Sequence, residues 1–238
     1  MSLKIFPILC NAGFMDNYAY LLTDSDTGVS AIVDAAEEKA IADFCHANNV
    51  VPQYIFTTHH HEDHTNANVA LKKYFGAKVV GSSVEAEKIS GLDIALNDGD
   101  VFALGNAKAQ VILTPGHTKG HLLWYFAKDK ALFTGDVLFN LCIGGLFEGT
   151  PQQMWQSLQK IKALPDDVRF YPGHEYTRAS YSLLAARRNE PAILQYLQFL
   201  ETCRQNNVPP VGNTLGLEKL CNPYLRIDNE NEFIQQMS

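Results

Sequence analysis

The stretch that most constrains this chain is Thr57–His64, which reads Thr-Thr-His-His-His-Glu-Asp-His. Half of the eight histidines of the chain fall within six residues here. Imidazole nitrogens are donors that borderline divalent ions such as Zn²⁺ take. Residues two apart in an extended segment point to the same side, so His59 and His61 can share one ion while His60 points elsewhere.

The same stretch offers a second set of donors. If the chain turns into a helix directly after His61, Asp63 and His64 reach a neighbouring position. A carboxylate oxygen and another imidazole nitrogen can then hold a second ion. The stretch lies far from either terminus, which argues against a cloning tag, and a plain solvated loop rarely spaces four donors in this way.

Three later strand-like runs point to the same centre. Each run is followed by a glycine and then by one residue able to bind a metal. Glycine lets the backbone turn sharply and approach a shared centre closely. The runs are 111–114, 131–134 and 168–171, and the residues that follow them are His117, Asp136 and His174.

A centre of two ions needs about three protein ligands per ion and a shared bridge, with the ions about 3.5–4 Å apart. We expect two sets of ligands: His59, His61 and His117 for one ion, and Asp63, His64 and His174 for the other. Asp136 is a carboxylate able to bridge both ions. The remaining position is expected to hold a bridging water whose pKa the two cations lower towards neutrality. His121 is an alternative further ligand, although a supporting role is favoured.

Composition limits the kinds of protein this can be. At 238 residues with 46% hydrophobic content, the chain can bury one core plus a small appendage, or form two domains. Its net charge of −7 argues against binding nucleic acid mainly by charge.

No apolar run approaches the ~20 residues that cross a bilayer, and Pro7 interrupts the N-terminal run too early for a signal peptide. No membrane partner is therefore expected. Five scattered cysteines without a CxxC pair indicate reduced thiols in a cytoplasmic protein.

Periodicity and turn residues predict mixed elements followed by helices alone. Beyond residue 177 no strand pattern returns, and a small helical C-terminal domain is expected beside the metal site. The predicted strands before it, besides the three runs above, are 4–9, 18–23, 30–34, 51–58 and 78–81. The predicted helices are 37–48, 66–74, 84–89, 181–188 and 191–206.

The type and order of these donors resemble the metallo-β-lactamase superfamily. Within it, the chain resembles glyoxalase II, the hydroxyacylglutathione hydrolases, over nearly its whole length. The segments that carry this likeness are Thr57–His61, Phe133–Asp136, Phe147–Thr150, Gly173–Thr177, Thr214–Leu215, Glu218 and Asn222–Arg226. The resemblance implies an α/β fold, a four-layer αββα sandwich over residues 1–174, followed by a small all-helical substrate-binding domain over residues 175–238.

The resemblance also implies a binuclear metal-dependent thioesterase. It would hydrolyse S-D-lactoylglutathione, or a related acyl-thioester, to D-lactate and a free thiol, by attack of a metal-bridging hydroxide. Asp63 and Asp136 are the expected catalytic residues. Two divalent ions are expected, Zn²⁺ before iron or manganese. A stable thiolate needs no separate acid to leave. The expected partner is a small glutathione conjugate, bound by a monomer.

One part of the chain departs from the family pattern. Similar enzymes place a lysine and a tyrosine before Glu-Gly-Thr to hold glutathione, and basic residues near the C-terminus. Here the matching positions are Gly145 and Phe147, and residues 234–238 carry no basic pair. Tyr176 is the member of the substrate-binding set that remains.

Three other functions fit the sequence less well. A persulfide dioxygenase is a mononuclear iron enzyme on the same fold, but it uses fewer protein ligands than this chain offers. A nuclease of the same superfamily needs an RNA-gripping domain and a basic surface. A scaffold without catalytic activity would not be expected to keep every ligand type. The full donor set therefore favours a two-metal hydrolase.

Overall fold

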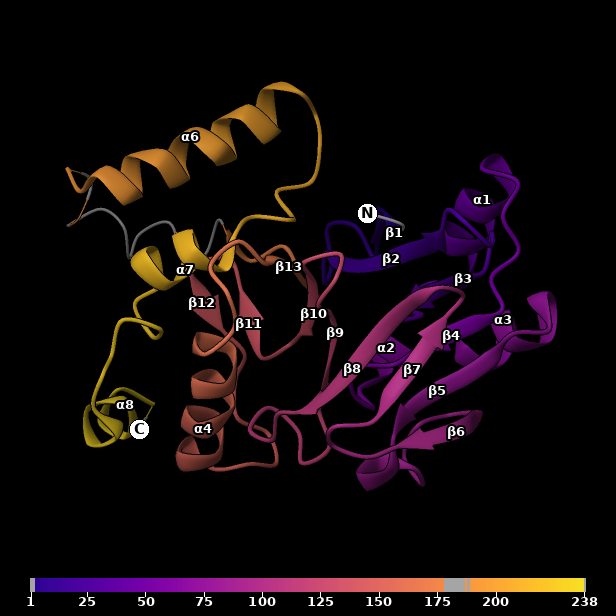
Figure 1. The fold of residues 1–238 in the computed structure, drawn as a ribbon, viewed down its shortest axis with the longest axis horizontal. Coiled ribbons are helices and arrows are strands. Elements are labelled where there is room, and N and C mark those ends of the chain that lie inside the picture. The colour runs from indigo at the N-terminus through magenta and orange to yellow at the C-terminus, as the bar shows by residue number, and fades with distance from the viewer. Residues whose placement is uncertain (1–2, 178–186, 188, 238) are drawn as a thin grey trace.

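The computed structural model describes residues 3–177, 187 and 189–237. Two β-sheets pack face to face and helices cover their outer faces (Figure 1), so the expected four-layer α/β sandwich is confirmed. The first sheet has the strand order of the sequence; β1–β3 pair antiparallel and β3–β6 pair parallel. Its strands are β1 (Leu3–Cys10), β2 (Asn17–Asp24), β3 (Ser30–Val33), β4 (Tyr54–Phe56), β5 (Lys78–Ser82) and β6 (Leu92–Leu96).

Helices α1 (Glu38–Ala47) and α3 (Asn68–Phe75) cover the outer face of this first sheet (Figure 1). Their buried side chains, among them Ile41 and Leu71, pack on every second residue of the strands. As the sequence predicts, α3 ends at Gly76, whose φ of 71° closes the helix in the left-handed conformation.

The second sheet has the order β13-β10-β9-β8-β7, and only its β10–β13 pair is parallel. Helix α4 (Pro151–Lys162) covers its outer face and begins at a capping box formed by Thr150 and Gln153. A small separate hairpin, β11 (Leu138–Phe139) and β12 (Cys142–Ile143), follows β10. The sheet strands are β7 (Val101–Leu104), β8 (Ala107–Leu113), β9 (Leu122–Phe126), β10 (Ala131–Gly135) and β13 (Arg169–Pro172).

The main core lies between the two sheets. Most strands are buried on both faces and so read as continuous apolar runs, with alternate residues serving the inner and outer cores. On β4, for example, Ile55 packs against the helices while Phe56 faces the other sheet. Phe56 stacks on Trp124 with ring centroids 4.3 Å apart. This aromatic pair joins the two sheets directly beneath the edge where the histidines gather.

Strand direction brings the predicted donors to one edge. β8, β10 and β13 run the same way, because β8 and β10 both pair antiparallel with β9 and β13 pairs parallel with β10. Their carboxyl ends therefore meet at one edge, as do those of the parallel strands β3 and β4. A hydrogen bond from Tyr18 N to Gly173 O joins the two sheets there, and one from Gly173 N to Gly135 O joins the ends of β13 and β10.

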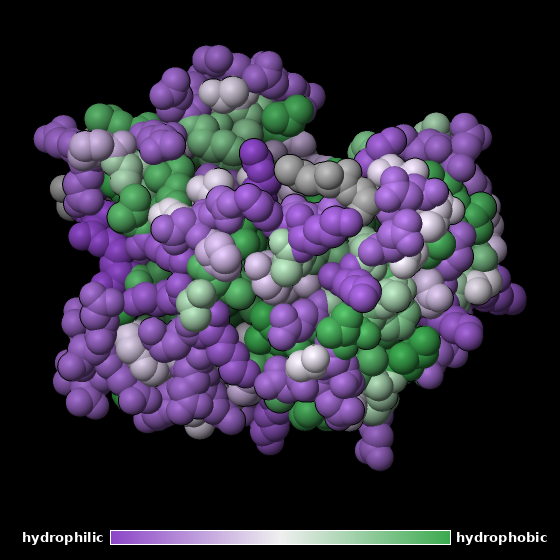
Figure 2. Space-filling model, viewed as in Figure 1, coloured by the Kyte–Doolittle hydropathy of each residue, from purple (hydrophilic) through white to green (hydrophobic). Residues whose placement is uncertain are grey.

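Helices follow the second sheet, as the sequence predicts. In the described part of the chain beyond residue 177 the regular elements are α6 (Pro191–Gln205), α7 (Leu215–Cys221) and α8 (Glu230–Met237), and α8 packs on α4. Figure 2 shows apolar side chains on the side of α6 that faces the body of the molecule. The predicted helix 181–188 falls almost entirely outside the described residues. None of the described helices has both the length and the apolarity needed to cross a bilayer.

Two predicted elements differ from the structure. The strand predicted at 51–58 is only Tyr54–Phe56, since Pro52 has no N–H to give to a strand ladder. The helix predicted at 84–89 is wrong: a single 3₁₀ turn, η1 (Ser83–Glu85), is followed by turns. Gly91, with φ of 75°, then redirects the chain into β6, which leaves no room for a full helix.

We predict that Phe56→Ala destabilises the protein through this inter-sheet stack. Removing a fully buried phenyl ring should lower the free energy of unfolding by about 3–5 kcal/mol, since it loses apolar burial and leaves a cavity. The matched control is Val51→Ala at an exposed position, expected to change it by no more than about 0.5 kcal/mol. Urea unfolding followed by tryptophan fluorescence measures both; equal midpoints would contradict the role of the stack.

Candidate metal centre

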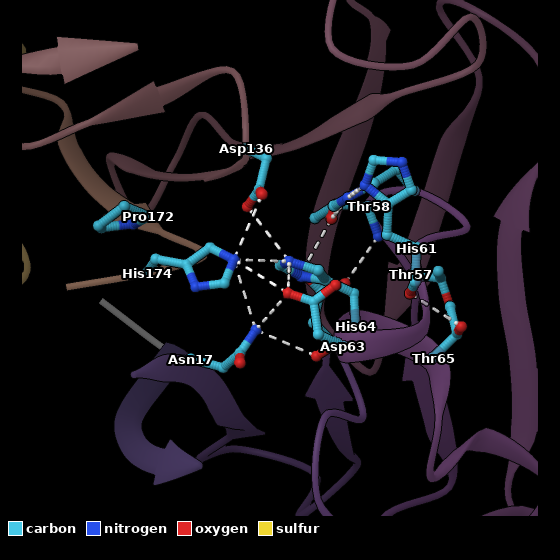
Figure 3. A network of polar contacts seen from close by, with 12 residues as sticks. Asn17, Thr57, Thr58, His61, Asp63, His64, Thr65, Asp136, Pro172 and His174 are labelled. Atoms are coloured by element: carbon cyan, nitrogen blue, oxygen red, sulfur yellow. Dashed lines mark hydrogen bonds and ion pairs between the residues drawn. The ribbon is translucent and has the colours of Figure 1, made fainter. Parts of the chain in front are cut away.

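All the donors predicted from the sequence lie together at this edge. They arrive from separate segments: the loop after β4, the short helix α2 (Glu62–Thr65) and the loops after β8, β10 and β13. Figure 3 shows Asp136, His174, His64 and Asp63 pointing towards one another. The predicted donors form three overlapping groups, and within each group the donor atoms all lie within 4.8 Å of one another. The groups are His59, His61 and His117; His59, His64 and Asp136; and Asp63, His64 and His174.

In the first group, three ring nitrogens face one another. His61 Nδ1 lies 3.0 Å from His59 Nε2 and 3.0 Å from His117 Nε2. The outer nitrogens are already engaged: His59 Nδ1 lies 3.0 Å from Thr58 Oγ1 and His117 Nδ1 lies 2.8 Å from Gly145 O. Protons on these outer nitrogens leave lone pairs on the inner ones.

The protonation of this group suits a cation. Burial lowers the pKa of His59, His61 and His117, so these rings are neutral near pH 7. Lone pairs held this close repel one another unless a positive ion lies between them. The donors therefore fit a divalent ion of the borderline kind.

The second group of predicted ligands, Asp63, His64 and His174, combines two imidazoles with a carboxylate. Asp63 Oδ2 lies 3.2 Å from His174 Nε2 and 3.4 Å from His64 Nε2, and the two ring nitrogens are 3.1 Å apart. His64 Nδ1 donates to Asp34 Oδ2 at 2.9 Å, and His174 Nδ1 donates to Met15 O at 2.8 Å. Again the outer nitrogens are satisfied and the inner ones converge.

Electrostatics in the second group differ from those in the first. Burial by itself lowers the pKa of His64 and His174, but the nearby carboxylates outweigh it. The pKa of His174 rises to about 9, chiefly through Asp136. The two imidazoles in turn hold the pKa of Asp63 and Asp136 below the usual range, despite burial. Negative charge is concentrated here, and a divalent cation can take the place of the protons that offset it.

Asp136 lies between the two groups. Its Oδ1 is 3.2 Å from His64 Nε2, while its Oδ2 is 3.4 Å from His117 Nε2 and 3.3 Å from His174 Nε2. The backbone N–H of Asp136 donates to His121 Nε2 at 3.1 Å. His121 thus uses its inner nitrogen to hold the Asp136 backbone, which places it behind the donors and not among them.

Two glycines make this close approach possible. Gly135 has φ of 44°, and a Cβ there would lie 2.6 Å from His121 Nε2. A Cβ on Gly173 would lie 2.4 Å from Asp136 Oδ1 and 2.8 Å from His64 Cε1. Only glycine allows these two strand ends to meet beside the carboxylate.

Two supporting residues escaped the sequence interpretation. Asp34 follows β3 with φ of 57° and accepts hydrogen bonds from Thr58 N, Thr58 Oγ1 and His64 Nδ1. Asn17 donates through Nδ2 to both Asp63 O and Asp63 Oδ2. Asp34 could have been found, since it is one more acid at a strand end. Nothing local in the sequence marks Asn17.

His60 lies outside the three groups of donors. Its backbone N–H donates to Glu85 Oε2, and its ring nitrogens lie 3.0 Å from Glu85 Oε2 and 3.6 Å from Glu148 Oε1. Gly120 N and Lys88 Nζ donate to the same two carboxylates. These contacts fix the backbone of the histidine loop from outside the centre.

A cleft of about 540 Å³ opens over the donors. Phe147 sits at its mouth with 72% of its surface exposed, and its ring centroid lies 5.2 Å from that of His61 and 5.1 Å from that of His117. Tyr176 stacks on His174 at 4.7 Å. Lysine and arginine are absent among the described residues that line it: Met15, His61, Glu62, Asp63, His117, Asp136, Phe139, Gly144, Gly145, Phe147, His174 and Tyr176.

Comparison with known proteins matches both parts of the chain. Residues 12–174 match the metallo-β-lactamase superfamily, and residues 175–238 match the hydroxyacylglutathione hydrolase C-terminus. Hydroxyacylglutathione hydrolase from Chelativorans is 42% identical over 227 residues, which cover 95% of this chain and 88% of the relative. That of Pelagibacter ubique is 36% identical over 219 residues, 92% of each chain. The crystal structure of ETHE1 from Myxococcus xanthus has a TM-score of 0.75 at 25% identity, covering 98% of this chain and 89% of that one.

Fold and site together define a metal-binding hydrolase of the metallo-β-lactamase superfamily. The helical C-terminal part narrows this class further. The chain belongs to the hydroxyacylglutathione hydrolase, or glyoxalase II, family of thioester hydrolases.

We predict that Asp34→Asn weakens metal binding without unfolding the protein. Asparagine tolerates the left-handed backbone, but it removes the charge that orients His64, and loss of such a partner costs about 10–100-fold in metal affinity. The matched control is Asp24→Asn, a buried carboxylate at the other end of β2 from Asn17, where it accepts from Thr27 Oγ1 and Asn106 N. Competition between apoprotein and a chelator for Zn²⁺ measures the affinity; equal values for wild type and Asp34→Asn would contradict the prediction.

Proposed function

We propose that this enzyme hydrolyses S-D-lactoylglutathione, or a closely related acyl-thioester, at a centre of two divalent ions. The observation that carries the proposal is the pair of donor groups with Asp136 between them, at the floor of a cleft. The names of the relatives support the class of substrate.

In this proposal each ion has its own set of protein ligands. His59, His61 and His117 would hold one; Asp63, His64 and His174 would hold the other, with Asp136 shared between them. Zn²⁺ suits this nitrogen-rich set, and iron or manganese suits the carboxylates as well. When bound, such ions polarise a thioester carbonyl and make water a nucleophile near neutral pH.

The remaining work falls to the residues of the chain. Asp34 and Asn17 orient His64 and Asp63, while His121 holds the backbone of Asp136. In the reaction the oxygen of water forms a C–O bond to the carbonyl carbon, the protons of that water pass to solvent, and the C–S bond breaks. The thiolate then leaves without a dedicated acid, because a thiol has a pKa of only about 8.5.

The walls of the cleft supply binding. Met15, Phe139 and Tyr176 lie on the side of the second donor group, and Gly145 and Phe147 on the side of the first. These surfaces exclude water and pack against the apolar parts of a thioester. We assign Tyr176, Phe147 and Gly145 to substrate contact on this ground.

The setting of the enzyme belongs to the same proposal. The five cysteines, all among the described residues, form no disulfide, which suits a reducing cytoplasm. We propose a monomer with a catalytic unit over residues 1–174 and a helical substrate-binding unit over residues 175–238.

The test of this function is steady-state hydrolysis of S-D-lactoylglutathione beside other acyl-thioesters, with metal counted per chain. We expect two ions per chain and the highest kcat/KM with hydroxyacyl-glutathione thioesters. One iron per chain together with oxygen consumption on a persulfide would instead identify the mononuclear alternative. In that case Asp63, His64 and His174 would not form a second site.

We predict that Asp136→Ala lowers the metal content below two ions per chain and lowers kcat by at least about 100-fold, because both groups lose their shared carboxylate. The matched control is His60→Ala, which removes a neighbouring histidine whose ring faces Glu85. That variant should keep both ions. Full loading and near-normal turnover of Asp136→Ala, or loss of an ion from His60→Ala, would contradict the assignment.

We predict that Gly145→Lys with Phe147→Tyr tightens binding of the thiol half. The cleft has no described cationic lining residue, and a Cβ at Gly145 has room, since its nearest neighbour is Phe147 at 3.6 Å. One charge-assisted contact with a glutathione carboxylate is worth ~1.5–3 kcal/mol. KM should therefore fall about tenfold or more at similar kcat. A wild-type KM in the low micromolar range, unimproved by the double change, would show that other residues hold the peptide.

A further inference from the structure

The β11–β12 hairpin forms part of the cleft wall. It begins two residues after Asp136, and Phe139 on it lines the cleft with its ring 5.7 Å from that of His174. The chain leaves the hairpin through Gly144 and Gly145, and Gly145 O accepts from His117 Nδ1. The shape of this hairpin therefore influences both sides of the proposed catalytic site.

The turn of the hairpin is strained. Phe139 pairs with Cys142, so Asn140 and Leu141 form a two-residue turn. Leu141 has φ of 63°, a left-handed conformation in which such turns usually place glycine, asparagine or aspartate. A buried leucine persists there only when surrounding contacts hold it.

Those contacts come from the C-terminal helices. Leu141 N donates to Glu218 Oε1 at 2.6 Å, and Glu218 lies on α7, next to the hairpin in Figure 1. Asn222 Nδ2 donates to the same oxygen at 2.8 Å and to Cys142 O at 3.1 Å. Tyr196 OH on α6 donates to Asn140 Oδ1 at 2.9 Å. Both residues of the turn, and Cys142 directly after it, are thus bound by side chains that follow residue 190.

We infer that Glu218 is a positioning residue, which holds the strained β11–β12 turn and through it the wall of the cleft formed by Phe139, Gly144 and Gly145. The inference rests on the proposed function only for what the wall binds; the contact with the turn stands independently. It also gives the C-terminal helices a role in building the site, whether or not they touch substrate.

Burial supports this assignment. Glu218 is fully buried, and no lysine or arginine among the described residues forms an ion pair with it. Burial raises the pKa of its carboxyl to about 7, although hydrogen bonds from Asn222 Nδ2 and Leu141 N act to lower it. Burying an acid carries a cost that an apolar residue would avoid. Its acceptor oxygen, which serves the turn and Asn222, accounts for a polar group at this position.

The test uses the full-length, metal-loaded enzyme with Glu218→Ala and Glu218→Gln. We measure kcat, KM, metal content and amide hydrogen exchange of a peptide covering residues 138–146. Without the acceptor, exchange in this peptide should speed up about tenfold or more, because a hydrogen bond to a buried carboxylate shifts an equilibrium by at least that factor. KM should rise more than kcat falls. Glu218→Gln should keep both KM and the exchange rate of this peptide close to the wild-type values, because an amide oxygen can accept the same two hydrogen bonds.

The matched control is Phe233→Leu, also fully buried in the C-terminal helices but packed on Trp155 of α4. It should lower the thermal midpoint while leaving KM and hairpin exchange unchanged. If Glu218→Ala behaves like this control, a purely structural role replaces the inference. If Glu218→Ala does not fold, Asn222→Ala provides a milder probe that should act in the same direction; unchanged exchange there would also overturn the inference. Exchange needs no substrate, so a failed thioesterase assay would count against the proposed function alone.

Discussion

The structure depends on one electrostatic constraint, the convergence of imidazole and carboxylate groups that would repel one another if left alone. Neutral rings meet nitrogen to nitrogen at 3.0 Å in the first group, and Asp63 and Asp136 crowd around His64 and His174 in the second. Such an arrangement is stable only with a cation, or protons, between the donors and with a rigid surround. The two-sheet core provides that surround, because the segments that carry the donors follow the ends of its strands β4, β8, β10 and β13.

The groups behind the donors are as specific as the donors themselves. The outer nitrogens of four of the rings are bound to Thr58, Gly145 O, Asp34 and Met15 O, which sets the tautomer and direction of His59, His117, His64 and His174. His121 holds the Asp136 backbone. The glutamates Glu85 and Glu148 tie down the histidine loop from its far side. These contacts hold the donors in fixed orientations relative to the packed core.

The cleft follows from the same arrangement of strand ends. The loops that deliver the donors also supply its walls, so binding surface and reactive centre are built from the same segments. Those walls are mostly aromatic and glycine, and the acids lie on the floor. The β11–β12 hairpin after Asp136 depends on contacts from outside it, because its turn residue Leu141 adopts a left-handed conformation that is unfavourable for leucine. The C-terminal helices stabilise it from behind, which links the two parts of the chain through the site.

The sequence alone determined which imidazole and carboxylate donors come together, the four-layer fold and the helical end of the chain. Donor type, spacing and strand-end glycines are local properties, and parallel strand ends can only meet at one edge. Strands β6, β7 and β9 were not predicted, because short or fully buried runs lack a decisive period. Helix α4 was not predicted either, although its buried Met154, Leu158 and Ile161 lie at helical spacing and a capping box begins it. Asn17, the bonds of His121 and the Glu218–Leu141 contact belong to the tertiary structure. They join residues 15 to 77 positions apart, and no pattern of neighbouring residues specifies which backbone group will lie opposite which side chain once the sheets have packed.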